Sequence, residues 1–182
     1  MKDFLNSENT SHGLRDLIEE IHSGYYETIN LLCNNISRLI KDINAGGIRP
    51  ENTAYISAAK TIVAEAEKYI AQRMLIFIPY INALVQKDMD GHNCSTCSGI
   101  CELQHREQLI SFSEQQQRFK EHMTGLTKVS SKIYKRDEPE NLKALHNKMT
   151  LLHNMVAELL YMEEDALLPK IVASQKNIYA LR

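Results

Sequence analysis

Four polar residues fall where a repeating apolar pattern calls for a buried side chain: His22, Arg73, His105 and Glu163. Around each of them apolar residues recur in alternating steps of three and four, which is the period of a helix face buried in a bundle. In an antiparallel bundle, Glu163 would lie level with His105, and Arg73 with His22. We expect all four side chains to face inward at one end of the bundle. A buried, unpaired charge is costly there, so metal ligation or mutual pairing must compensate.

Two arrangements of these residues satisfy that requirement. A guanidinium is always charged and fits a carboxylate with two parallel hydrogen bonds, so Arg73 and Glu163 can form a polar core without metal. The alternative is a site for a single ion, either iron or zinc, which such hard ligands suit. Its ligands would be His22, His105, Glu163 and a phenolate from Tyr26 or Tyr69.

A second possible site lies in the segment Gly91–His105, where Cys94, Cys97 and Cys101 crowd together. Their spacing is compact enough for one tetrahedral metal ion, with His92 or His105 as the fourth ligand. Alternatively, the same thiols could serve redox chemistry, or they could be loop thiols without a chemical role. Cysteines this close together suit metal or redox chemistry better than the disulfide framework of a secreted domain.

Helix breakers divide the chain into the long segments that would position these residues. The breaks are Gly46-Gly47 with Pro50, the stretch 88–99, and 135–141. They leave segments of about 14–44, 53–87, 100–133 and 139–174, each with helical periodicity. The expected stripe of the first segment contains Ile18, His22, Tyr25, Ile29, Leu32, Ile36 and Leu39, and that of the second contains Tyr55, Ala59, Ile62, Ala66 and Tyr69. The stripe of the third contains Leu109, Phe112, Gln116, Phe119, Met123 and Leu126, and that of the fourth contains Leu142, Leu145, Met149, Leu152, Val156 and Leu159.

Four such segments with short connections predict an all-α, antiparallel, up-down-up-down four-helix bundle. We expect one domain over residues 1–182, with its core at about 14–174 and a cysteine-containing loop at 88–101.

Composition narrows the function classes. The chain has 182 residues, 43% of them hydrophobic, and a formal net charge of −2, which does not favour a nucleic-acid partner. Its longest apolar run, from Met74, contains Pro79 and is too short to cross a bilayer, and no signal-peptide core precedes it. We therefore expect a cytoplasmic protein that does not contact membranes. No hydrolase, P-loop or dinucleotide motif is present, so the sequence does not favour an enzyme.

The two halves of the chain share a pattern. AQRMLIFIPYI (Ala71–Ile81) matches YMEEDALLPKI (Tyr161–Ile171) when the prolines are aligned. With the opening ELQHREQL (Glu102–Leu109) and the helix Leu14–Leu32, this repeat resembles the hemerythrin-like, or HHE cation-binding, domain family. Within that family the pattern resembles the di-iron proteins that repair iron–sulfur clusters after nitric oxide or oxidative stress.

The resemblance implies a hemerythrin-like bundle whose iron ligands fall on particular positions of this chain: Tyr25 or Tyr26, Tyr69, Arg73, His105, Leu159 and Glu163. Among these only His105 and Glu163 keep the ligand type. The resemblance therefore implies a largely lost di-iron site and a binding or regulatory module in metal, redox or nitrosative stress, with an unidentified protein or a second copy of the chain as partner. The alternative is a stress protein that binds non-haem iron or zinc at a remodelled bundle site or at the cysteine loop.

Overall fold

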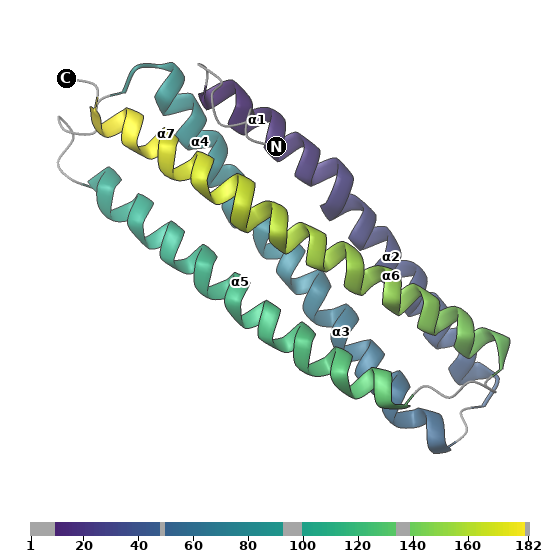
Figure 1. Cartoon of the computed structure of the whole chain (residues 1–182). Helices are drawn as coiled ribbons and strands as arrows, with labels where there is room; N and C mark the ends of the chain where they lie inside the picture. Colours follow the sequence, from purple (N-terminus) through teal and green to yellow (C-terminus); the bar gives the residue numbers. More distant parts are fainter. Residues whose placement is uncertain (1–9, 48–49, 93–99, 134–138, 181–182) are drawn as a thin grey trace.

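The chain forms a bundle of four long helices in the computed structural model, which describes residues 10–47, 50–92, 100–133 and 139–180 (Figure 1). The first helix consists of α1 (Thr10–Ile21), η2 (His22–Tyr26) and α2 (Glu27–Ala45). The second consists of α3 (Thr53–Gln72), η4 (Arg73–Phe77) and α4 (Ile78–Met89), preceded by the short turn η3 (Pro50–Asn52). The third is α5 (Ile100–Ile133), and the fourth consists of α6 (Glu140–Met162), η5 (Glu163–Leu167) and α7 (Leu168–Ala180).

Consecutive helices run antiparallel and pack around a common core. α2 packs against α3 and α6, α3 packs against α5, and α4 contacts α7 directly. No β-strand occurs in the described ranges. The predicted all-α four-helix bundle is therefore confirmed, and none of the described helices is long and apolar enough to cross a membrane.

Helix ends fall where the sequence contains breakers. Gly47, after α2, has φ 87°, and Gly91, after α4, has φ 63°, a left-handed conformation that glycine adopts without the strain of a side chain. Pro139 precedes α6, and its carbonyl accepts hydrogen bonds from the backbone N–H groups of Leu142 and Lys143. The fourth helix continues to Ala180, past the end at about residue 174 that the sequence predicted.

The core follows the predicted stripes in the second and fourth helices. In α3 the stripe from Tyr55 to Tyr69 is buried and continues to Arg73, and in α6 the stripe from Leu142 to Leu159 is buried and continues to Glu163. The third helix buries four residues of its predicted stripe: Phe112, Gln116, Phe119 and Met123. Leu109 is only partly buried, and Leu126 is not among the residues whose side chains the structure describes.

The first helix departs from its predicted stripe. His22, Tyr25 and Leu39 are only partly buried, whereas Tyr26 is 2% exposed. The reason is the π-helical turn η2, in which the N–H of Glu27 bonds to the carbonyl of His22. One extra residue in that turn rotates the following helix face by about 100°, so burial passes from Ile21 to Tyr26.

The repeated sequence is also a repeated local structure. In η4 the N–H of Ile78 bonds to the carbonyl of Arg73, and in η5 the N–H of Leu168 bonds to the carbonyl of Glu163. Each of these two π turns is followed by a proline, Pro79 or Pro169. Because proline lacks an N–H and its ring crowds the carbonyl four residues earlier, a wider turn relieves the clash without ending the helix.

Candidate functional site

Arg73 and Glu163 form an ion pair in the interior of the bundle. Their side chains are 1% and 0% exposed, and Nε of Arg73 donates to Oε1 of Glu163 at 3.2 Å. A second bond runs from Nη2 of Arg73 to Oε2 of Glu163 at 3.4 Å. Each residue is the first of its π turn, in the second and fourth helices respectively. The pairing of Arg73 with Glu163 that the sequence suggested is thus present in the structure.

Further donors surround the carboxylate of Glu163. The Tyr26 hydroxyl donates to Oε1 at 2.8 Å, and the Tyr69 hydroxyl donates to Oε2. Nε2 of Gln116 lies 3.4 Å from Oε2 and also donates to the carbonyl of Leu160. Both oxygens of Glu163 are therefore engaged by side chains from the other three helices.

The guanidinium of Arg73 is equally enclosed. Nη1 donates to Oε1 of Gln115 at 3.2 Å, and Nη2 donates to the Tyr69 hydroxyl at 2.6 Å and to the carbonyl of Phe112 at 3.3 Å. Its central carbon lies 3.8 Å from the centre of the Phe112 ring and 4.3 Å from that of Tyr69. These cation–π contacts add to the stabilisation of a charge that has lost its water.

The protonation states follow from burial and charge. Burial, then the charge of Glu163, raises the pKa of Tyr26 and of Tyr69 well above the usual value. Burial acts to lower the pKa of Arg73, but the neighbouring Glu163, Tyr69 and Tyr26 raise it overall. The cluster therefore contains a cation and neutral phenols that donate hydrogen bonds, and neither tyrosine is a phenolate.

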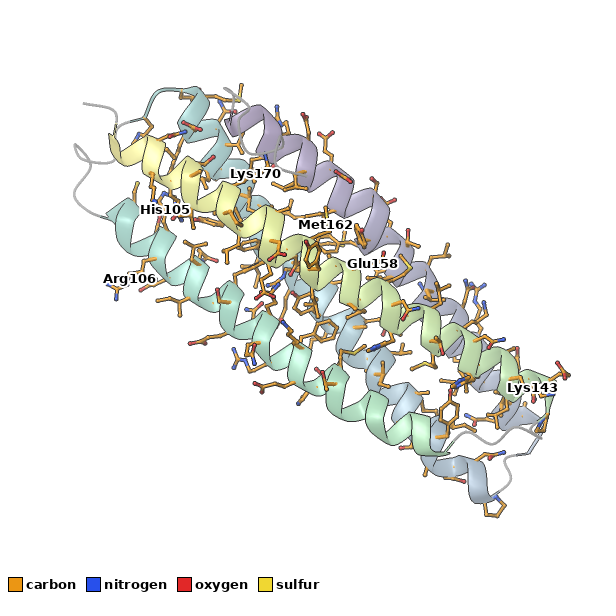
Figure 2. The ribbon with its side chains drawn as sticks, viewed as in Figure 1. His105, Arg106, Lys143, Glu158, Met162 and Lys170 are labelled. Atoms are coloured by element: carbon orange, nitrogen blue, oxygen red, sulfur yellow. The ribbon has the colours of Figure 1, made fainter. Side chains whose placement is uncertain are left out.

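His105 lies elsewhere, which corrects the predicted register. It is 4% exposed, and its Nδ1 lies 3.2 Å from the Tyr80 hydroxyl, which accepts a bond from Nε2 of Gln175 at 2.7 Å. Figure 2 shows His105 near the loop end of α5, whereas Met162, the neighbour of Glu163, lies nearer the middle of the bundle. The residue of α5 that meets Glu163 is Gln116, because the fourth helix is longer than predicted and Glu163 is not close to its end.

Burial, together with the charges of Lys87 and His92, lowers the pKa of His105 to about 4. His105 is thus neutral near pH 7, and its Nδ1 shares a hydrogen bond with the Tyr80 hydroxyl.

His22 is also separated from Arg73. Its side chain is 36% exposed, and Nδ1 lies 3.4 Å from a carboxylate oxygen of Glu27 on the outside of the first helix. The first helix contributes Tyr26 to the cluster instead. Gln115 and Gln116 were not predicted to belong to the site, although Gln116 is a polar residue on the predicted stripe of the third segment.

The donor set around Glu163 does not fit a metal centre. The ligand positions implied by the resemblance hold Tyr26, Tyr69, Arg73 and the fully buried Leu159, and His105 is turned toward Tyr80. Within the described ranges no group of three or more His, Cys, Asp or Glu side chains is arranged to hold an ion. Arg73 places a permanent cation against the carboxylate that a metal would need.

The cysteine loop is described only in part. Cys94 and Cys97 lie outside the described residues. Sγ of Cys101 lies 3.9 Å from Nε2 of His92, and Nζ of Lys87 lies 3.4 Å from the same sulfur. Two of the expected ligands of the loop, His92 and Cys101, therefore meet at the end of the bundle.

The fold and the site together define a four-helix bundle with a buried ionic core. Comparison of the chain with protein-family models, with curated proteins and with solved structures found no match.

Proposed function

We propose that this protein is a hemerythrin-like binding or regulatory module that has lost its di-iron site and acts in metal, redox or nitrosative stress. The observation that carries the proposal is the ion pair of Arg73 and Glu163 at 3.2 Å in the centre of the bundle. The resemblance places these two residues where the irons of the family would be bridged. Here a guanidinium supplies the positive charge that the irons would supply there.

The hydrogen bonds around the pair support this reading. Tyr26, Tyr69 and Gln116 engage the oxygens of Glu163, and Gln115 and the carbonyl of Phe112 engage Arg73. A metal ion would have to displace Arg73 and leave a buried cation unpaired, which is strongly unfavourable. We propose no reaction at this centre, and its role is to keep the bundle rigid while its outer faces bind a protein partner or a second copy of the chain.

Metal analysis tests the proposal. Protein expressed in medium supplemented with iron and zinc, and purified without chelators, should contain no stoichiometric iron and lack the near-ultraviolet absorption of an oxo-bridged di-iron centre. The double variant Arg73→Glu with Leu159→His restores two ligand types of the family and should take up more iron than the wild type or either single variant. About two irons per wild-type chain, with the di-iron spectrum, would refute the proposal.

A second candidate function is supported by the meeting of His92 with Cys101. Their 3.9 Å separation is close to that of two ligands on one tetrahedral zinc ion, with Zn–N of about 2.0 Å and Zn–S of about 2.3 Å. A metal-binding stress protein would hold such an ion with these residues and the nearby thiols. About one zinc per chain, lost in Cys101→Ser but kept in Cys33→Ser, would favour this candidate, and zinc-free wild-type protein would exclude it.

A further inference from the structure

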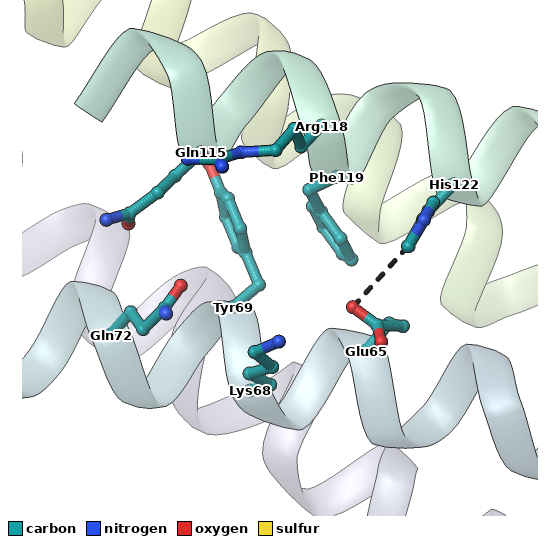
Figure 3. A pocket seen from close by; sticks show the side chains of 8 residues that line it. All are labelled: Glu65, Lys68, Tyr69, Gln72, Gln115, Arg118, Phe119 and His122. Atoms are coloured by element: carbon teal, nitrogen blue, oxygen red, sulfur yellow. Dashed lines mark ion pairs between the residues drawn. The ribbon is translucent and has the colours of Figure 1, made fainter. Parts of the chain in front are cut away.

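A polar cleft lies between α3 and α5, beside the ionic core (Figure 3). Its volume is about 240 Å³. The cleft is lined by Glu65, Lys68, Tyr69, Gln72, Gln115, Arg118, Phe119 and His122. Ligand sites for drug-sized molecules begin at about 300 Å³, so this cleft suits a smaller molecule.

Two aromatic rings form the floor of the cleft. The rings of Tyr69 and Phe119 stack with their centres 4.1 Å apart, and both side chains are buried. Figure 3 shows these rings between the two helices, with polar side chains of α3 and α5 around them. A rigid apolar floor with polar walls is the usual construction of a small-molecule site.

The charges on the walls favour an anion. Lys68 makes no ion pair with any residue that the structure describes, and Gln72 offers an amide that likewise has no hydrogen bond there. Among the described residues Arg118 makes polar contacts with Glu114 alone, on its own helix: its Nε donates to the Glu114 carbonyl at 3.2 Å, and its Nη2 lies 3.7 Å from the exposed Glu114 carboxylate. The single lining carboxylate, Glu65, is 3.6 Å from Nδ1 of His122. Two cationic side chains therefore line the cleft, with one carboxylate.

The same cleft touches the ionic core. The ring of Tyr69 lines the cleft while its hydroxyl donates to Glu163. Gln115 lines the cleft while its Oε1 accepts a bond from Arg73. A molecule in the cleft would contact both residues that connect the surface with the buried ion pair.

We infer that the cleft binds a small oxyanion, a molecule with carboxylate or phosphate groups that Lys68 and Arg118 hold over the rings of Tyr69 and Phe119. Lys68 acts as a point charge, and the guanidinium of Arg118 can grip two oxygens at once. The inference rests on the proposed function, since it names the class of ligand to which the module responds.

Isothermal titration calorimetry of the full chain with citrate, and separately with inorganic phosphate, tests the inference at constant ionic strength set with sodium chloride. We expect saturable binding of one anion per chain, and the better ligand of the two identifies the carboxylate or the phosphate class. Lys68→Met should weaken binding about threefold, and the double change with Arg118→Leu about tenfold or more. Lys60→Met removes the same charge two turns away on α3 and should leave the affinity unchanged.

A steric variant tests the place of binding independently of charge. Gln72→Phe keeps every charge and fills the cleft, so it should abolish binding while the far-ultraviolet circular dichroism stays that of the wild type. The inference would be overturned if neither citrate nor phosphate showed saturable binding. It would also be overturned if Lys60→Met and Lys68→Met weakened anion binding equally. Iron in the wild-type protein would refute the proposed function even if citrate bound, whereas failure of both anions in iron-free protein would refute the cleft alone.

Discussion

Arg73 and Glu163 lose their water when the bundle closes around them, and the loss is offset by the groups that each touches. Desolvation of such a pair often outweighs its attraction unless further hydrogen bonds are present. Here Tyr26, Tyr69 and Gln116 donate to the carboxylate. The pair is therefore sensitive to the loss of either partner.

We expect Arg73→Leu to lower the free energy of unfolding by roughly 3–5 kcal/mol, because Glu163 remains as an uncompensated buried carboxylate. The double change with Glu163→Leu should recover much of that loss, since both charges leave the core together. A double-mutant cycle by urea denaturation measures the coupling.

The exposed pair of Lys120 and Glu164, 3.2 Å apart and both about half exposed, is the matched control for this cycle. Lys120→Met should cost less than about 1 kcal/mol because water screens the charges. An effect of Arg73→Leu as small as that of the control would contradict the role assigned to the buried pair.

His105 should make stability depend on pH in the acid range. Its pKa is lowered to about 4 in the folded protein, first by burial and then by Lys87 and His92, against about 6.5 when unfolded. Between these values the unfolded chain binds a proton that the folded chain does not, so the free energy of unfolding should fall by up to about 3 kcal/mol as pH drops from 6.5 to 4.

Urea denaturation of the wild type and of His105→Gln across this pH range measures the contribution. The free energy of unfolding of the variant should fall less steeply as the pH drops, because the variant lacks the titrating imidazole. His122, 64% exposed on the same helix, provides an exposed control variant, His122→Gln. Identical slopes for the wild type and His105→Gln would mean that His105 titrates normally.

At the scale of the helices, the π turns determine which side chains reach the core. η2 ends at Tyr26, η4 begins at Arg73 and η5 begins at Glu163, so three helices widen where they contribute to the cluster. π turns are rare and are frequently found at functional sites. Their coincidence with the ionic core indicates that they orient its side chains.

Gly24 lies within η2, and an added Cβ would meet no atom within 4 Å. Gly24→Ala should therefore raise the free energy of unfolding by about 0.5–1 kcal/mol, because alanine loses less backbone entropy on forming the helix. Gly47→Ala should instead destabilise, by about 1 kcal/mol, since φ at Gly47 is 87°. Thermal unfolding followed by circular dichroism compares the two variants, and a shift of the same sign in both would contradict these conformations.

At the scale of the whole molecule, the bundle has one continuous core that includes the thiol of Cys33. Cys33 is fully buried, and burial, then the charge of Glu67, raises its pKa to about 12. Its reaction with iodoacetamide should thus require unfolding of the bundle, whereas the partly buried Cys101 should react in the folded protein.

Peptide mapping by mass spectrometry at increasing urea distinguishes the two thiols. The labelling rate of Cys33 should rise with urea in parallel with the unfolded fraction. Rapid labelling of Cys33 without urea, with the helical signal intact, would show that the first helix opens locally.

The sequence by itself determined the helices and their buried faces over most of their length. Breakers such as Gly47 and Pro139 and the apolar period act over a few residues, so the elements and the inward position of Arg73 and Glu163 could be predicted. That Arg73 and Glu163 lie together was expected from their inward positions at one end of the bundle and from the resemblance.

Only the tertiary structure decided which residues complete the site. The register between helices depends on packing along their whole length, and it places Gln116, not His105, against Glu163. A single π turn rotates a helix face by about 100°, and it buries Tyr26 in place of His22. Neither effect can be read from the spacing of apolar residues along one helix, because both arise when four helices pack together into one core.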